Sequence, residues 1–481
     1  MALIGSIVSH ARTAPGRTAV VNNGQTYSYR AFAGLIAGAR AVLARQSPPT
    51  DRVAVLCVDA PFDAWIIGIA LRSLGVTTVN ARSVEDIGRL NLGPVSVVWG
   101  EAGPWPGLAA EAERAGCSSL AVSQADCLGG VQALASSLPE PPDDAGGGHI
   151  LLTSGTTGVY KKILASAAQE ARNVASRAEP FGLNAASVVN VFDFGGWTGI
   201  GYRYPVAVWT VGGAVVIDQS VDGRRSFRPQ ELTHAFVQPQ LLAELLATPT
   251  EGAQRNDAMM LAFGGGVLSV AHWRAARERF TDAVCTTIGA TEIGNLTLTR
   301  IESPEDLPWH RVCEGIEVQI VDDNDQPLPA GQTGVVRMRT TGVEGYLGDP
   351  QTSAAFFRGG FFYPGDLGVL REDGRLSLQG RVTDVINVGG DKIATTPIET
   401  LIQDRLGAEA VCVFSVPGQD GEAVHVAIQP GRPIKPAELK AALVEALAGL
   451  AEQVQAHQVA AFPRNHMGKI ERAALKQRLL G

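Results

Sequence analysis

The chain has 481 residues, of which 45% are hydrophobic and 18% charged, and its formal net charge is -8. This length allows two or three domains with sizeable cores. The acidic balance argues against nucleic-acid binding, which calls for a basic surface. No run of about 18 apolar residues is present, so we expect no membrane span.

The six cysteines are scattered and include no C-x-x-C pair. Metal and disulfide frameworks usually show close spacing, so reduced thiols are the expected state. The first residues lack a basic segment followed by a long apolar one. We therefore expect a cytoplasmic protein.

The first hundred residues predict a βαβ unit. A short turn at 26–29 leads into an amphipathic helix that ends near Ala44. A buried strand at 53–58, a helix at 61–74 and a second strand at 76–79 follow. Strand, helix and strand in so short a window indicate a parallel α/β sheet.

Further strands follow the same pattern up to about residue 300. They are expected at 188–192, 214–217, 262–268 and 285–288. Beyond that point, short strands separated by turn residues indicate an antiparallel β region, for example at 317–321, 334–339 and 374–380.

After Val385 a smaller α/β module is expected, with strands at 411–414 and 424–428, a helix at 436–447 and a last strand at 459–462. We therefore predict a large N-terminal domain, 1–383, and a small C-terminal domain, 384–481.

The segment 151–163, LLTSGTTGVYKKI, is the most informative in the chain. Glycines permit a tight turn, while backbone amides, short hydroxyls and a nearby lysine are what a phosphate chain needs. It differs from the GxxxxGK[ST] loop because no lysine follows Gly158 directly. Taken alone, the segment is also compatible with a polar surface turn.

Four other motifs place charged residues in turns: Thr287–Glu292 (TIGATE), Tyr363–Gly368 (YPGDLG), Gly380–Asp384 (GRVTD) and Pro463–Arg472 (PRNHMGKIER). Glu292 follows a strand end, where α/β sheets bind ligands. Each motif has a plain alternative. Glu292 fits the first turn of a helix, Asp366 an ordinary turn, and Lys469 a solvated surface position.

Together and in this order, TSGTTG, GATE, GDLG, GR-x-x-D and GKI-x-R resemble one family: the adenylate-forming enzymes that include acyl-CoA synthetases, nonribosomal-peptide adenylation domains and luciferases. The resemblance extends from Thr26 to Leu475. It implies a large N-terminal domain of parallel α/β sheets with a small β-barrel-like region. It also implies a small mobile C-terminal α+β lid that carries the catalytic lysine.

The resemblance implies two half-reactions. ATP and a carboxylic acid form an acyl-adenylate and pyrophosphate, and a nucleophile, commonly a thiol, then displaces AMP. The implied catalytic residues are Lys469, Glu292 and Thr153, with Glu292 also binding Mg²⁺. The implied nucleotide-binding residues are Ser154, Gly155, Thr156, Thr157, Gly158, Lys161, Gly265, Gly289, Thr291, Asp366 and Arg381. Asp384 corresponds to the hinge of the small domain.

This chain departs from the family pattern at several positions. Tyr160 and Lys162 stand where the family usually has proline and glycine around a lysine, which predicts a stiffer phosphate loop. Ile288 replaces the aromatic that commonly stacks on adenine. Pro364 replaces a threonine before GDLG, and only Asp384 remains of a pair of aspartates.

The segment Phe192–Gly199, FDFGGWTG, bears on the substrate. In the amino-acid-activating members Phe-Asp-x-x-x-Trp holds the α-ammonium, so Asp193 predicts an amine-bearing or polar small acid. The alternative is that Asp193 bonds nearby backbone amides, because a buried carboxylate needs a donor or a cation. The expected pocket wall comprises Asp193, Phe194, Trp197, Gly264 and Ile288, and it suits a compact, amino- or aryl-type acid.

The acyl acceptor is left open. No carrier domain follows Lys469, so we expect free CoA, the phosphopantetheine of a stand-alone carrier protein, or an amine or other small nucleophile. A catalytically weak nucleotide-binding relative is the remaining alternative. The expected assembly is a monomer or homodimer.

Overall fold

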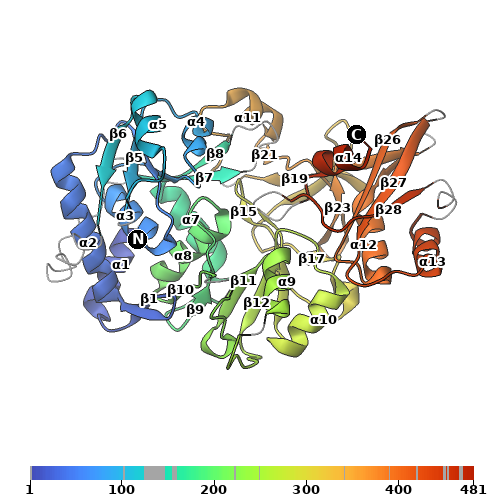
Figure 1. The fold of residues 1–481 in the computed structure, drawn as a ribbon, viewed down its shortest axis with the longest axis horizontal. Helices are drawn as coiled ribbons and strands as arrows, with labels where there is room; N and C mark the ends of the chain where they lie inside the picture. Colours follow the sequence, from blue (N-terminus) through green and yellow to red (C-terminus); the bar gives the residue numbers. More distant parts are fainter. Residues whose placement is uncertain are drawn as a thin grey trace.

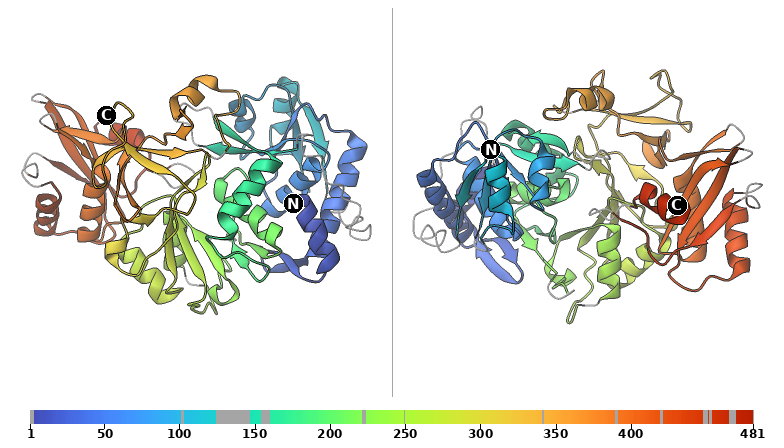
Figure 2. Two further views of the ribbon diagram at one scale, coloured as in Figure 1. Left: turned by 180° about the vertical axis from the view of Figure 1, so that it is seen from behind. Right: turned by 45° about the horizontal axis from the view of Figure 1, so that its top comes forward.

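The computed structural model describes residues 3–100, 103–123, 147–153, 160–220, 224–248, 250–340, 342–388, 391–418, 421–447, 451, 454–464 and 470–480. The expected mixed α/β architecture is confirmed. Figures 1 and 2 show the N-terminal helices at one end of the molecule and the C-terminal elements at the other.

The first sheet has six strands in the order β6-β5-β3-β4-β7-β8. All its strand pairs are parallel except β7 with β8. The strands are β3 (Val53–Leu56), β4 (Thr78–Asn80), β5 (Val95–Trp99), β6 (Ser118–Ala121), β7 (His149–Thr153) and β8 (Lys161–Ala165). The connecting helices are α3 (Pro61–Arg72), α4 (Glu85–Leu90) and α5 (Leu108–Arg114).

The second sheet has eight strands in the order β16-β13-β12-β11-β9-β10-β1-β2. They are β1 (Thr18–Asn22), β2 (Gln25–Ser28), β9 (Val188–Asn190), β10 (Ala214–Ile217), β11 (His234–Val237), β12 (Met260–Gly264), β13 (Val284–Thr287) and β16 (Thr299–Arg300). The helices around the two sheets are α1 (Leu3–Thr13), α2 (Tyr29–Gln46), α7 (Ala167–Ala178), α8 (Gly199–Val211), α9 (Pro239–Ala247) and α10 (Val270–Arg279).

The turn expected at 26–29 is wrong by a few residues. Residues 25–28 form strand β2, and the chain reverses at Asn23 and Gly24, which have φ of 47° and 84°. An Asn-Gly pair with positive φ suits a two-residue hairpin. Ser28 then caps α2 by accepting a hydrogen bond from the amide of Ala31, 3.2 Å.

The third sheet is antiparallel, as expected for the region after residue 300. It follows the order β17-β23-β22-β19-β21-β20, with β18 paired to β19. Its strands are β17 (His310–Arg311), β18 (Val318–Val321), β19 (Thr333–Arg339), β20 (Phe357–Arg358), β21 (Phe361–Phe362), β22 (Asp366–Leu370) and β23 (Arg375–Arg381), and helix α11 (Pro350–Phe356) precedes β20.

The C-terminal part contains β24 (Val385–Val388), β25 (Asp391–Ala394), α12 (Thr395–Leu406), β26 (Ala410–Gly418), β27 (Gly421–Gln429), α13 (Pro436–Leu447), β28 (Gln455–Gln458) and α14 (Arg472–Leu480). Buried side chains of α12, α13 and β26–β27 form a core of their own. The last strand was expected at 459–462 and instead occupies 455–458, parallel to β27.

Within the described residues, a hydrogen bond joins this part to a helix of the second sheet. Asp404 on α12 accepts from the backbone amide of Val270, the first residue of α10, at 3.3 Å. Among the described residues, no helix combines the length and apolar character needed to cross a lipid bilayer.

Candidate functional site

Glu292 lies in a tight hairpin beyond the end of β13. The flanking strands are β14 (Gly289–Ala290) and β15 (Gly294–Asn295). A Cβ at Gly289 would lie 2.7 Å from the carbonyl oxygen of Gly294, so this approach requires glycine. The alternative of a helix beginning at this motif is therefore wrong.

The Glu292 carboxylate is 8% exposed and has a hydroxyl partner. The Tyr346 hydroxyl donates a hydrogen bond to its Oε1 at 2.7 Å. Tyr346 is itself buried, and it comes from the segment between β19 and α11. Burial, together with the nearby Glu292 charge, raises the pKa of Tyr346 well above its usual range.

Lys161 opens strand β8 and lies directly across from Thr153 at the end of β7. Its Nζ sits 3.5 Å from the ring centroid of Phe356 and 5.1 Å from that of Tyr346. Burial lowers the pKa of Lys161, with Arg381 adding to the effect and Glu292 opposing it. Lys161 is therefore an electrostatic neighbour of both Glu292 and Arg381.

Two buried arginines lie behind the Glu292 hairpin. Arg203 on α8 donates to the carbonyl oxygens of Ala290, at 3.4 Å, and Thr291. A Cβ on Gly294 would lie 3.1 Å from Arg177 and 3.5 Å from Arg203. The Nε of each arginine has no hydrogen-bond partner. Burial, with Arg177 adding to it, lowers the pKa of Arg203 to about 9.

Asp366 and Arg381 face each other across β22 and β23. Arg381 Nε is 3.2 Å from Asp366 Oδ1, and the guanidinium also donates to the Pro364 carbonyl. The arginine side chain is 48% exposed and the aspartate 19%. These two predicted residues therefore form a pair that solvent and ligands can reach.

Asp384, the expected hinge residue, is fixed by an ion pair. Its Oδ2 lies 3.1 Å from Nε of Arg472, whose Nη1 and Nη2 bind Glu399 of α12 at 2.7 and 2.9 Å. Thr395 also donates to the Asp384 carbonyl, at 2.9 Å. The start of α14 is thereby tied to the start of the C-terminal part.

The structure gives Asp193 an arginine partner that the sequence did not indicate. Its carboxylate is 41% exposed and pairs with Arg225 at 3.1 Å. The Arg225 side chain is 9% exposed and also pairs with Glu244 at 3.1 Å. Asp193 therefore has a cation from its own chain, which it shares with Glu244.

The other expected pocket residues line strand ends of the second sheet. Phe194 packs against the core around Phe192 and α9. Gly264 ends β12, and Gly265 has a φ of +81°, which favours glycine. Ile288 is half-buried and packs against the third sheet's core. Thr291 approaches the start of α8, near Gly199.

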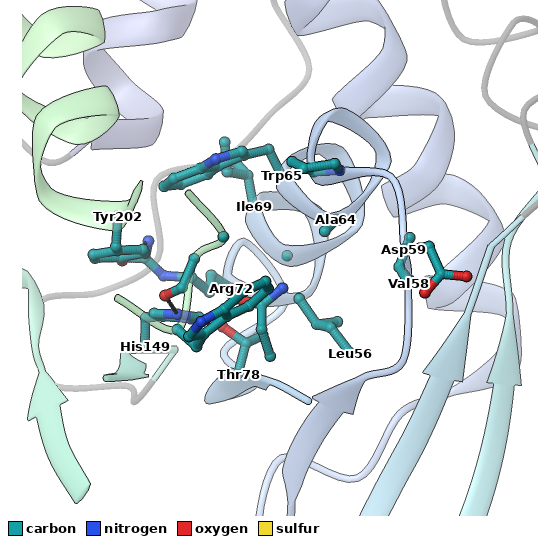
Figure 3. A pocket seen from close by; sticks show the side chains of 16 residues that line it. Leu56, Val58, Asp59, Ala64, Trp65, Ile69, Arg72, Thr78, His149 and Tyr202 are labelled. Carbon is teal, nitrogen blue, oxygen red and sulfur yellow. Dashed lines mark hydrogen bonds between the residues drawn. The ribbon is translucent and has the colours of Figure 1, made fainter. Parts of the chain in front are cut away.

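Trp197 points elsewhere, into a cavity between α3, the ends of β3 and β4, and α8. A Cβ at Gly195 would lie 1.9 Å from the Trp197 ring, which therefore covers that glycine. Figure 3 shows His149 and Tyr202 together on one side of this cavity and Asp59 on the other. About 20 Å³ of this cavity is accessible to water.

Polar groups beside this cavity bind one another, and only Oε2 of Glu170 among the atoms named here has no hydrogen-bond partner. Arg72 pairs with Glu170 at 2.8 Å and donates to the Tyr202 hydroxyl at 2.5 Å. His149 hydrogen-bonds Thr78 and the Gly196 carbonyl, each at 2.8 Å, and stacks on Tyr202 with ring centroids 4.2 Å apart.

Two departures from the family pattern act as anchors. The Tyr160 hydroxyl donates to Asp86 Oδ1 at 2.9 Å, and Nζ of the buried Lys162 donates to the Leu90 carbonyl at 2.7 Å. Both contacts fasten the start of β8 to α4. Lys469 and residues 154–158 lie outside the described residues, so their predicted roles stay predictions.

The profile of the AMP-binding enzyme family matches residues 7–347. The chain belongs to the AMP-binding enzyme family.

Curated relatives in this family are similar over part of their length. The fatty acid–[acyl-carrier-protein] ligase ScoC of Streptomyces coeruleorubidus is 29% identical over 52% of this chain and 50% of the relative. The salicyl-AMP ligase / salicyl-S-ArCP synthetase of Mycobacterium tuberculosis is 29% identical over 71% of this chain and 63% of the relative. The matches therefore span about half to under two thirds of these relatives.

A solved structure of ATP-bound MatB from Rhodopseudomonas palustris superposes with a TM-score of 0.83. The alignment covers 99% of both chains at 20% identity. At this identity the likeness establishes the shared fold, with its large N-terminal and small C-terminal domains.

Sequence reasoning missed four residues of the site: Tyr346, Phe356, Arg177 and Arg203. Tyr346 was hidden in a loop-like stretch, GYLGDP, whose composition indicates only a turn. Arg203 is surrounded by apolar residues on α8, and an arginine flanked by two tyrosines there was the one available signal.

Proposed function

We propose that the protein uses ATP to activate a small carboxylic acid and then transfers the acyl group to a thiol. A carboxylate oxygen attacks the α-phosphorus, the bond to the β-phosphate breaks, and pyrophosphate leaves. The thiol sulfur then attacks the acyl carbon, and AMP leaves.

The observation that carries this proposal is an excess of positive charge around Glu292. Lys161, Arg177 and Arg203 lie around its hairpin, and burial lowers the pKa of all three. Buried cations without matching carboxylates are costly. A bound polyanion such as a triphosphate would offset that cost.

Glu292 fits Mg²⁺ by the chemistry of its donor set. Among the described residues, no group of three or more His, Cys, Asp or Glu could hold a metal alone. Mg²⁺ commonly uses one or two carboxylates, with substrate phosphates and water as its other ligands. When bound, it would neutralise phosphate charge, while Glu292 and the Thr153 hydroxyl orient it.

The other residues take positioning roles. Asp366, with two acceptor oxygens, would receive the ribose hydroxyls, and Arg381 would support it. Lys161 and segment 154–158 would contact the β- and γ-phosphates. Gly265, Gly289 and Thr291 would form the edge of the nucleotide site, and Lys469 would stabilise the charge that develops during attack.

We further propose the boundary between domains 1–383 and 384–481, with Asp384 as the hinge. The separate C-terminal core and the fixed geometry at Asp384 support this division. Rotation there would bring Lys469 to the site for adenylation and withdraw it for transfer.

An aryl acid is the favoured substrate. Because Asp193 pairs with Arg225, that carboxylate has a cationic partner without a substrate ammonium. A named relative acts on salicylate. CoA or a carrier-protein phosphopantetheine would supply the thiol, since another relative is named as a carrier-protein ligase.

ATP–pyrophosphate exchange with salicylate, an amino acid and a fatty acid tests the proposal. We expect exchange with salicylate or a related aryl acid, and Lys469→Ala should abolish it. Exchange with the fatty acid alone would overturn the aryl assignment. No exchange with any of the three acids would contradict the proposed activation.

A further inference from the structure

The segment that carries Tyr346 is fastened on two sides of the Glu292 site. The Leu347 amide donates to the carbonyl oxygen of Lys162 in β8 at 2.8 Å. The Tyr346 amide donates to Ser353 Oγ in α11, also at 2.8 Å. The backbone at Tyr346 and Leu347 is therefore hydrogen-bonded to both β8 and α11 where the tyrosine approaches Glu292.

The ring of Tyr346 sits in an aromatic cluster. Its centroid lies 6.0 Å from that of Phe356 and 5.3 Å from that of Phe357, both in edge-on geometry. This leaves the phenol little freedom to turn, and its hydroxyl is aimed at Glu292 Oε1 at 2.7 Å.

The rings of Tyr346 and Phe356 also contact Lys161. Its Nζ lies over Phe356 and within reach of the Tyr346 face, so cation–π attraction keeps an ammonium beside a carboxylate. A carboxylate has about four lone-pair positions on its two oxygens. Tyr346 occupies one of them, which leaves acceptor positions for a cation.

We propose that Tyr346 is a positioning residue that presents the Glu292 carboxylate to a divalent cation, and that Phe356 separately positions Lys161 for the nucleotide. The proposal rests on the proposed function, because it takes Glu292 as a ligand of Mg²⁺. Groups that orient a metal ligand typically change metal affinity by about 10- to 100-fold when removed.

The test uses Mn²⁺ as the probe and the full chain. Free Mn²⁺ is measured by electron paramagnetic resonance in the presence of a non-hydrolysable ATP analogue, so no carboxylic acid and no turnover are needed. For Tyr346→Phe we expect the Mn²⁺ dissociation constant to rise about tenfold, while the affinity for the metal-free analogue stays within about twofold.

Two further variants separate positioning from loss of stability. Tyr29→Phe removes the hydroxyl of another buried tyrosine, which donates to the Gly213 carbonyl at 2.7 Å in the N-terminal core. It should leave Mn²⁺ binding unchanged. Phe356→Leu should lower the affinity for the ATP analogue about two- to fivefold, as expected for the loss of one cation–π contact. It should leave the Mn²⁺ affinity unchanged.

Unchanged Mn²⁺ affinity in Tyr346→Phe would overturn the proposal. So would an equal loss in Tyr29→Phe, or the absence of nucleotide-dependent Mn²⁺ binding in the wild type. Because the acid is omitted, failure of pyrophosphate exchange with every acid would count against the proposed function and leave this result standing.

Discussion

Tyr202 and Arg203 are consecutive residues on α8, yet each leads into a different buried polar cluster. Tyr202 joins Arg72 and Glu170, where one cation meets one anion. Arg203 lies behind Glu292, where cations outnumber the carboxylate. A buried cluster that neutralises itself is explained by folding, whereas one with surplus charge calls for a ligand. This difference separates structural from functional polar groups.

If the first cluster is purely structural, breaking it should cost stability and spare catalysis. Arg72→Met would leave Glu170 buried and unpaired, so the free energy of unfolding should fall by about 3–5 kcal/mol. Urea titration measures this, and pyrophosphate exchange by the folded fraction should stay within about threefold. Arg72→Met with Glu170→Leu should recover most of the loss. A double variant as unstable as the single one would contradict the ion-pair account.

Glu292→Gln should do the reverse. The amide oxygen can still accept the Tyr346 hydrogen bond, so stability should change by less than about 1 kcal/mol. Loss of the charge should lower pyrophosphate exchange by about 10²- to 10³-fold. The control is Glu244→Gln on α9, which removes one carboxylate partner of Arg225. Near-normal exchange in Glu292→Gln would place the metal ligand elsewhere.

The pH dependence of stability should report on His149 in the first cluster. Burial, with Arg72 adding to it, lowers the pKa of His149 to about 3. The folded protein keeps this ring neutral while the unfolded chain protonates it below about 6.5. The contribution of neutral His149 to the free energy of unfolding is therefore fully present above about pH 6.5 and is lost as the pH falls below it.

Between pH 7 and 5 this loss should be about 2 kcal/mol. His149→Gln should reduce the difference between urea titrations at the two pH values by that amount. An unchanged difference would show that His149 titrates normally in the folded protein.

The smallest effect is expected where β8 is anchored to α4. Tyr160→Phe removes the hydroxyl that donates to Asp86 and should lower the free energy of unfolding by about 1 kcal/mol. Thermal unfolding would detect it. A more stable variant would mean that the bond imposes strain on the hairpin.

Local patterns predicted the architecture well where burial and hydrogen bonding coincide. The helix at 436–447 has the predicted bounds. They failed at the last strand because the two properties separate there. Val459 and Phe462 are buried, but the strand that pairs with β27 is the polar run Gln455–Gln458. Apolar spacing reports burial, so it placed the strand too late.

The contacts of the candidate site also fall into two groups, those that the sequence predicts and those that it does not. The pairing of Asp366 with Arg381 follows from motifs on adjacent strands. The partner of Asp193 could not be predicted, because Arg225 lies 32 residues further along the chain, and only the folded second sheet brings them together. Tyr346 was equally hidden, since it lies 54 positions from Glu292.

The bond between Val270 and Asp404 has a consequence for labelling experiments. The Val270 amide is the first of α10, and its acceptor is a side chain of α12. An amide at the start of a helix has no partner within that helix. Its deuterium uptake should therefore accelerate whenever α12 moves away, so a single peptide that covers residue 270 would act as an intrinsic reporter of that motion.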